Sequence, residues 1–158
     1  MTHDDVPYVA VVGASRATES EERVAEEVGR GLAEAGAVVI TGGGPGVMEG
    51  ASRGAAQAGG VVIGLLPGAE RSRANPWVGI ALPTGLGELR NGLIVRAADA
   101  VVAIGGAYGT LSEVALALNA GLKVVGLDTW AIDGVTVVDS PGAAVRLVLE
   151  YATGRPRS

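Results

Sequence analysis

Residues 37–49 read AVVITGGGPGVME, and residues 100–112 read AVVAIGGAYGTLS. The two stretches align without a gap, and each consists of a largely apolar run, a glycine-rich loop and the start of a segment with helical periodicity. Apolar runs without polar alternation indicate strands that are covered on both faces, as in parallel sheets. Two strand–loop–helix units of this kind predict an α/β fold in which two glycine loops face one cleft.

The same alternation of strands and helices continues on both sides of these two units. The six expected strands are Tyr8–Val12, Ala37–Thr41, Val61–Leu65, Val78–Leu82, Ala100–Ile104 and Lys123–Leu127. The expected helices are Glu19–Ala35, Val47–Ala58, Glu88–Ala98, Thr110–Ala120 and a last one with Ser140 as N-cap and Pro141 at its first position. This order predicts a doubly wound, mainly parallel sheet with helices on both faces.

The chain of 158 residues provides one sizeable core, and no change in composition divides it. We expect a flexible N-terminus over residues 1–7, a single domain over residues 8–151 and a disordered tail over residues 152–158. The first seven residues, MTHDDVP, lack the apolar segment of a signal peptide, and no run is apolar enough to span a bilayer. A cytoplasmic protein without membrane contact is therefore expected.

The composition excludes several classes of protein and of chemistry. Hydrophobic residues make up 48% of the chain and charged residues 18%, which is incompatible with intrinsic disorder. The net charge of −5 argues against a nucleic-acid partner. There is no cysteine, and His3, the only histidine, lies in the polar N-terminus. Thiolate chemistry, a histidine-based triad, a metal site and a resident cofactor are not expected.

The two glycine loops are the candidate ligand-binding segments. In an open parallel sheet, ligands bind beyond the carboxyl ends of the strands. Backbone N–H groups at the start of the following helix favour a phosphate there. Neither loop has the lysine of a P-loop or the G-x-G-x-x-G spacing, and strand-to-helix turns alone would also explain the glycines. The candidate binding residues in these loops are Gly42, Gly43, Gly44, Gly46, Gly105, Gly106, Gly109 and Thr110.

Without a usable histidine or cysteine, acid–base chemistry must rest on a carboxylate near the strand ends or on a water molecule. Glu113 is one of four such carboxylates, with Glu49, Glu88 and Asp128. Because Glu113 follows Thr110 by three residues, the pair also fits a capping box that has no chemical role. One further side chain, Arg90, could hold an anion in a bidentate grip, although a solvated surface position would explain any single one of the eleven arginines.

The stretch TGGGPGVMEGASRGAAQAGG (residues 41–60), followed by Arg90 and by GGAYGTLSE (residues 105–113), resembles the LOG family, long mislabelled as lysine decarboxylases. The resemblance implies a Rossmann-like fold, a homodimer and binding of a nucleoside 5′-monophosphate such as AMP. It further implies hydrolysis of the N-glycosidic bond to the free base and ribose 5-phosphate. By this resemblance Arg90 and Glu113 are the expected catalytic residues, and Met48 contacts the nucleoside. The implied phosphate loop contains Gly106, Gly109 and Thr110.

Two departures from the family pattern favour an alternative. The usual Pro-Gly-Gly is Gly105-Gly106-Ala107 here, and the usual Met-His-Glu-Arg-Lys segment reads GELRN (residues 87–91), which keeps only its arginine. The second segment is similar to that of a sub-branch that includes the molybdenum cofactor carrier protein of algae. The alternative is thus a non-catalytic carrier of molybdopterin or another phosphorylated, nucleotide-like ligand. The loop of residues 68–76 could admit either a purine or a pterin.

Two further expectations concern the lysine and the dimer. Lys123 is the only lysine and lies at the amino end of its strand, away from the cleft, so pyridoxal-dependent decarboxylation is excluded. The helical segments Leu93–Val95 and Val114–Leu118 are apolar on nearly all sides. This pattern predicts a homodimer interface, with burial in the core as the other explanation.

Overall fold

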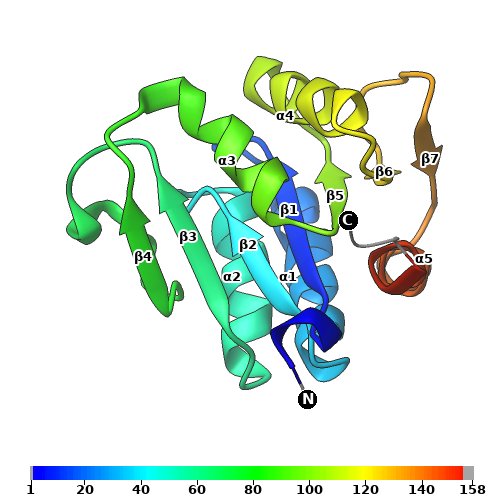
Figure 1. The fold of residues 1–158 in the computed structure, drawn as a ribbon, viewed down its shortest axis with the longest axis horizontal. Helices are drawn as coiled ribbons and strands as arrows, with labels where there is room; N and C mark the ends of the chain where they lie inside the picture. Colours follow the sequence, from blue (N-terminus) through cyan, green and yellow to red (C-terminus); the bar gives the residue numbers. More distant parts are fainter. Residues whose placement is uncertain (1, 155–158) are drawn as a thin grey trace.

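The computed structural model describes residues 2–154, in which seven strands form one parallel sheet (Figure 1). The strands are β1 (Tyr8–Gly13), β2 (Val38–Thr41), β3 (Val62–Leu66), β4 (Ile80–Pro83), β5 (Ala100–Ile104), β6 (Val124–Leu127) and β7 (Val135–Val137). Their order across the sheet is β4-β3-β2-β1-β5-β6-β7, and every neighbouring pair is parallel.

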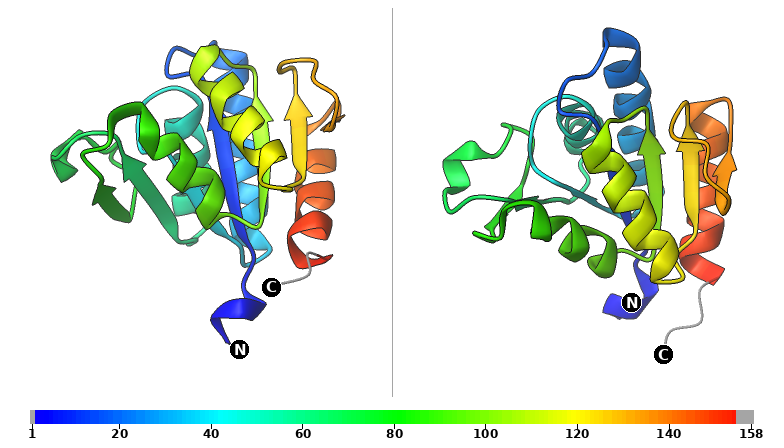
Figure 2. Two further views of the ribbon diagram at one scale, coloured as in Figure 1. Left: turned by 45° about the horizontal axis from the view of Figure 1, so that its top comes forward. Right: turned by 90° about the horizontal axis from the view of Figure 1, so that it is seen from above.

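Helices cover both faces of this sheet, which confirms the predicted doubly wound, Rossmann-like α/β fold (Figures 1 and 2). The α-helices are α1 (Glu19–Glu34), α2 (Val47–Gln57), α3 (Arg90–Ala97), α4 (Tyr108–Asn119) and α5 (Pro141–Gly154). The 3-10 turns are η1 (His3–Asp5), η2 (Arg71–Arg73) and η3 (Gly87–Leu89). Helices α1, α2 and α5 pack on one face, and α3 and α4 pack on the other.

The sheet separates two apolar cores, and the central strand contributes to both. In β1, Val9 and Val11 belong to the core beneath α1, α2 and α5, whereas Ala10 and Val12 belong to the core beneath α3 and α4. All four side chains are at most 1% exposed. Burial on both faces explains why the strand sequences are continuously apolar instead of alternating.

The direction of strand succession reverses between β1 and β5. From β1 the chain adds β2, β3 and β4 on one side, and it then returns to place β5, β6 and β7 on the other. Gly13, the last residue of β1, is in register with Ile104, the last residue of β5. The loops after these two strands therefore leave the sheet side by side. Such a reversal opens a crevice beyond the carboxyl ends of the strands.

The structure corrects the expected elements at several places. The strand β7 was not predicted, because three residues flanked by Asp133 and Asp139 give only a weak strand signal. The expected disordered tail is wrong for residues 152–154, because α5 continues to Gly154 and Ala152 is buried in the core. Residue 1 and residues 155–158 lie outside the described residues. No helix in the described range is long and apolar enough to cross a membrane.

Helix starts agree with the sequence at α5 and differ at α3 and α4. As predicted, Pro141 begins α5, and the Ser140 hydroxyl accepts a hydrogen bond from the N–H of Ala143 at 3.2 Å. The expected helix from Glu88 is divided into η3 and α3. Helix α4 begins at Tyr108, two residues before the expected Thr110. This shift changes the interpretation of the second glycine loop.

Candidate functional site

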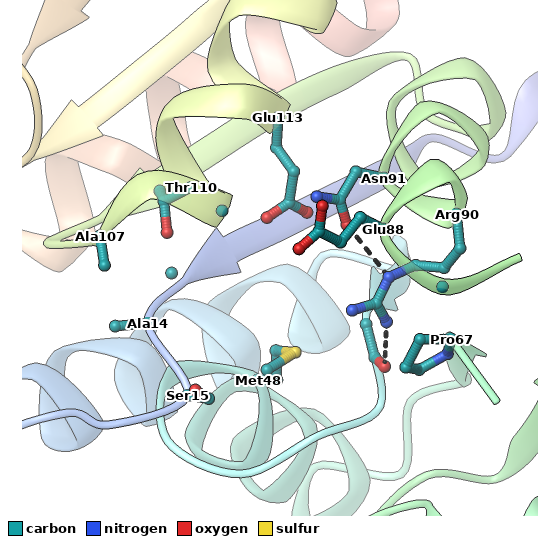
Figure 3. A pocket seen from close by; sticks show the side chains of 14 residues that line it. Ala14, Ser15, Met48, Pro67, Glu88, Arg90, Asn91, Ala107, Thr110 and Glu113 are labelled. Atoms are coloured by element: carbon teal, nitrogen blue, oxygen red, sulfur yellow. Dashed lines mark hydrogen bonds between the residues drawn. The ribbon is translucent and has the colours of Figure 1, made fainter.

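A cavity of about 370 Å³ opens at the carboxyl ends of the central strands, where the strand order reverses (Figure 3). Its size lies within the range of small-molecule sites. The lining residues are Gly13, Ala14, Ser15, Gly42, Met48, Pro67, Gly87, Glu88, Arg90, Asn91, Ala107, Gly109, Thr110 and Glu113. Segments far apart in the sequence thus meet here, and they include both expected catalytic residues.

The carboxylate of Glu113 projects from α4 into this cavity (Figure 3). Glu113 is only 8% exposed, and its carboxylate makes no hydrogen bond or ion pair with any residue that the structure describes. Burial raises the pKa of Glu113 from 4.5 to about 7, and the positive charge of Arg90 opposes part of this rise. A carboxyl group with a pKa near 7 can either donate or accept a proton at neutral pH.

The structure rules out the capping box suggested for Thr110 and Glu113. The N-cap of α4 is Ala107, which has no side-chain acceptor, and Thr110 is the third residue of the helix. Within the described chain, the N–H groups of Tyr108, Gly109 and Thr110 have no hydrogen-bond acceptor. Gly109 and Thr110 line the cavity. The free amide groups and the positive end of α4 therefore provide a place for an anion.

Arg90 is held rigidly at the opposite wall of the cavity. Its Nη1 donates to the carbonyl oxygens of Gly42 at 2.8 Å and Leu65 at 2.7 Å, and its Nε donates to Oδ1 of Asn91 at 3.0 Å. The other terminal nitrogen, Nη2, points into the cavity (Figure 3). Burial lowers the pKa of Arg90, and the negative charge of Glu113 raises it, but a guanidinium keeps its proton in either case.

Gly42 and Met48 form the wall next to Arg90. A Cβ atom on Gly42 would lie 2.8 Å from Nη1 of Arg90 and 2.7 Å from Sδ of Met48, so no larger residue fits there without moving the arginine. Met48, on α2, lies at the cavity surface below the guanidinium (Figure 3). The first glycine loop thus contributes to the site by positioning Arg90.

The remaining glycines of the first loop do not line the cavity. The N–H of Gly43 donates to the Thr41 hydroxyl at 3.0 Å, and the N–H of Val47, at the start of α2, donates to the carbonyl of Ala14 at 3.1 Å. Gly46 has a φ of +72° and packs against the loop after β1. The carbonyl of Gly44 accepts a hydrogen bond from Nδ2 of Asn75 at 2.9 Å. At the start of α2 the N–H of Val47 is thus occupied, whereas those of Met48 and Glu49 have no acceptor in the described chain.

The beginning of the second glycine loop also faces away from the cavity. Gly105 and Gly106 line a separate, shallow hollow with Thr129, Trp130 and Ala131. The Gly105 carbonyl accepts a hydrogen bond from the Thr129 hydroxyl at 2.5 Å, and the Gly105 N–H donates to Leu127 at 3.0 Å. Of the expected phosphate loop, only Gly109 and Thr110 line the cavity.

Sequence reasoning did not single out several residues that line the cavity. Ala14, Ser15 and Pro67 lie in loops that follow strands, and only their position after a strand could have indicated them. Glu88 was noted at the expected carboxyl edge but was not given a role. Asn91 is 7% exposed and orients Arg90, and its adjacency to that arginine was the only available signal.

Comparisons with known proteins agree with this architecture. A model of the SLOG cluster4 family matches residues 6–150. An uncharacterized protein of Archaeoglobus fulgidus is 40% identical over 138 residues, which cover 87% of this chain and 91% of the relative.

Two similar solved structures have names that state a ligand. The molybdenum cofactor binding protein from the phototrophic bacterium Rippkaea orientalis is 36% identical, with a TM-score of 0.87 over 92% of this chain and 96% of that one. The molybdenum cofactor carrier protein MCP from Chlamydomonas reinhardtii is 33% identical, with a TM-score of 0.82 over 92% of this chain and 98% of that one. These findings confirm the resemblance to LOG-like proteins and to their molybdenum cofactor carrier branch, and the chain belongs to the SLOG cluster4 family.

Proposed function

We propose that this protein binds a phosphorylated, ring-bearing ligand of the molybdopterin type in the cavity and carries it unchanged. The observation that carries the proposal is the N-terminus of α4, which has no side-chain cap and opens on the cavity at Gly109 and Thr110. A phosphate placed there accepts hydrogen bonds from free backbone N–H groups and meets the positive end of the helix.

The opposite wall supports the same ligand class. The Nη2 group of Arg90 is charged, directed into the cavity and fixed by the other bonds of the guanidinium, so it loses little conformational freedom on binding. The names of the Rippkaea and Chlamydomonas relatives support a molybdenum cofactor as the cargo. In this reading Glu113 is a contact for the ligand and performs no chemistry.

A second candidate function is hydrolysis of an AMP-like nucleoside 5′-monophosphate, and one observation favours it. A carboxyl group with a pKa of about 7 is suited to acid–base catalysis at neutral pH. With the phosphate at α4 and Arg90 beside the nucleotide, Glu113 would activate water for attack on the anomeric carbon or stabilise the oxocarbenium-like ribose. Water would add to the ribose, and the base would leave with a proton.

Two measurements separate these candidates. Purified protein is mixed with molybdenum cofactor released from a molybdoenzyme and passed through a gel-filtration column, and molybdenum and pterin are measured in the protein fraction. In parallel, AMP is incubated with the protein and with the Glu113→Gln variant, and the products are separated by chromatography. The carrier function predicts co-elution of molybdenum and pterin with the protein and no release of adenine. Absence of co-elution, with adenine produced only by the unsubstituted protein, would replace it with the hydrolase.

We also infer that the protein is a homodimer. The structure favours a different interface from the helical segments that the sequence suggested. Of the helical segments expected at the interface, Val95 and Val114 are at most 1% exposed and belong to the core, whereas Leu93 and Leu116 reach the surface. Support comes instead from the exposed apolar side chains of β4, η3 and α3.

A further inference from the structure

The carboxylate of Glu88 projects into the same cavity from η3 (Figure 3). Among the residues that the structure describes, the carboxylate of Glu88 has no hydrogen-bond or ion-pair partner. Glu113 lines the same cavity, is more than nine-tenths buried, and its carboxylate likewise has no such partner. Glu88 is an exposed residue at the cavity wall and Glu113 is a buried one, so the cavity offers a ligand two carboxylate acceptors that no described residue occupies.

The turn that carries Glu88 is well fixed. Gly85 and Gly87 have φ values of +66° and +59°, which side chains rarely adopt. The N–H of Gly85 donates to the carbonyl of Gly68, and the N–H of Gly87 donates to the carbonyl of Pro67, each at 2.9 Å. The backbone that leads into the turn is thereby tied to the loop after β3, which places the backbone of Glu88 at the cavity wall.

The cavity has an anion end and a carboxylate end. Figure 3 shows Ala107, Thr110, Ala14 and Ser15 on one side and Glu88 on the other, next to Arg90 and Pro67, with Glu113 between the two groups. A phosphate cannot sit against Glu88, because like charges repel each other. A ligand whose phosphate lies at α4 and which extends to this wall meets Glu88 best with a part that donates hydrogen bonds.

Ionised carboxylates only accept hydrogen bonds, and their two oxygens suit two parallel N–H donors. The 2-amino group and the adjacent ring N–H of a guanine or a pterin form such a pair. Adenine presents its amino group beside an unprotonated ring nitrogen, whose lone pair would face a carboxylate oxygen. Hypoxanthine keeps the ring N–H and lacks the 2-amino group.

We propose that Glu88 determines ligand specificity by accepting both N–H groups of a 2-amino-4-oxo ring, as found in pterins and guanine. This inference rests on the proposed binding of a phosphorylated ligand and makes it more specific. It assigns the phosphate to α4 and the ring edge to η3. It also predicts that the protein discriminates against AMP, the nucleotide that the family resemblance first suggests.

The test is a calorimetric titration of the protein with guanosine, inosine and adenosine 5′-monophosphates, which differ only at the ring edge. We expect GMP to bind at least about tenfold more tightly than AMP, with IMP between them. The loss of one hydrogen bond to a charged group weakens binding by about this factor. In Glu88→Gln one acceptor oxygen becomes an amide donor. The affinity for GMP should fall about tenfold, and the affinity for AMP should not fall.

The matched control is Glu49→Gln, which makes the same change at a half-buried position in the first turn of α2 that does not line the cavity. This variant should bind all three nucleotides as the unsubstituted protein does. Equal affinities for GMP and AMP, or an equal loss of both in Glu88→Gln, would overturn the role of Glu88 and leave phosphate binding intact. If none of the three nucleotides binds, this inference fails, whereas the proposed carrier function is decided separately by the co-elution of molybdenum and pterin with the protein.

Discussion

Glu113 makes the stability of the protein depend on pH. Its pKa is about 7 in the folded protein and 4.5 ordinarily, because burial penalises the charged form. The folded state therefore binds this proton more tightly than the unfolded chain does. The resulting stabilisation is complete below pH 4.5 and is lost as the pH rises through about 7. A pKa difference of this size between the folded and the unfolded state corresponds to about 3 kcal/mol in the free energy of unfolding.

We expect Glu113→Gln to remove this dependence, since glutamine has a similar shape and no charge to desolvate. At pH 8 the variant should have a free energy of unfolding up to about 3 kcal/mol higher than the unsubstituted protein, and at pH 4 the two should be similar. Urea unfolding at both pH values measures this. An equal difference at pH 4 and pH 8 would show that Glu113 is not the titrating group.

Gly46 tests the structural role of the first glycine loop. Its φ is +72°, and a Cβ atom would lie 2.3 Å from the carbonyl oxygen of Ala14, so Gly46→Ala combines backbone strain with a clash against rigid backbone. We expect a loss of roughly 3 kcal/mol or more in the free energy of unfolding. Gly59→Ala is the control, because Gly59 has a similar φ of +78° and nothing within 4 Å. It should lose about 1 kcal/mol, and similar losses in both variants would contradict the close packing.

The sequence could not distinguish the two glycine loops. Both run from a strand into a helix, and the prediction treated both as phosphate sites. The difference arises in tertiary structure. The carbonyl of Ala14 accepts a hydrogen bond from the first N–H of α2, at Val47, and leaves the next two without an acceptor, whereas no acceptor in the described chain reaches any of the first three N–H groups of α4. The partner that decides the outcome lies more than thirty residues away in the sequence, so local pattern could not reveal it.

At the scale of elements, the segment after β6 braces the start of α4. The Nε1 group of Trp130 donates to the carbonyl of Ala107 at 3.1 Å, and its ring stacks on that of Tyr108 with a centroid distance of 6.2 Å. Ala107 and Tyr108 begin the helix end at which we place the phosphate. The environment of Trp130 should therefore respond to a bound ligand.

We expect Trp130 fluorescence to report binding. The chain has two tryptophans, and Trp77→Phe leaves Trp130 as the only one. Addition of GMP to this variant should change the emission in a saturable way, with the affinity that calorimetry gives. In Trp130→Phe, where Trp77 remains, the change should disappear. Calorimetric binding with constant emission in Trp77→Phe would show that the ligand does not contact the start of α4.

Most elements could be predicted because their signals are local. The Pro141 start of α5 follows from the Ser140 N-cap, and the six longer strands follow from apolar runs. The start of α4 at Tyr108 could not, because Thr110 and Glu113 fit a capping box equally well in sequence. That two-residue shift turns Thr110 from a cap into a cavity residue. The prediction of the candidate site thus depended on where α4 begins. Of all features of a helix, its first residue is the one that the local sequence determines least.

At the scale of the whole molecule, the doubly wound order was predictable from the alternation of strands and helices, whereas the uncovered part of the sheet was not. Ile80 and Leu82 of β4 are in register with Ile63 and Leu65 of β3, which pack in the core beneath α3 and α4. The β4 side chains therefore face the same side, yet they are 45% and 44% exposed because no helix of residues 2–154 extends over this edge.

This edge continues into a larger apolar surface. Next to it in the chain, η3 and α3 expose Leu86, Leu89 and Leu93, and Leu89 is 77% exposed. We infer that these side chains form one apolar surface with β4, which would be typical of contacts between proteins, and a C2 dimer would bury the same surface on both copies. The surface lies beside Glu88 and Arg90, so a partner copy there would also restrict access to the cavity.

We therefore expect the protein to sediment with twice the mass of one chain. Leu89→Glu should dissociate the dimer, because an isologous interface would bring two unpaired carboxylates into an apolar contact. Leu116→Glu is the control, since Leu116 is also exposed, at 41%, but lies on α4, outside the surface formed by β4, η3 and α3. It should sediment as the unsubstituted protein does, and circular dichroism should show that both variants are folded. A single-chain mass for the unsubstituted protein at micromolar concentration would rule out the dimer, and a dimer that persists in Leu89→Glu would place its interface elsewhere.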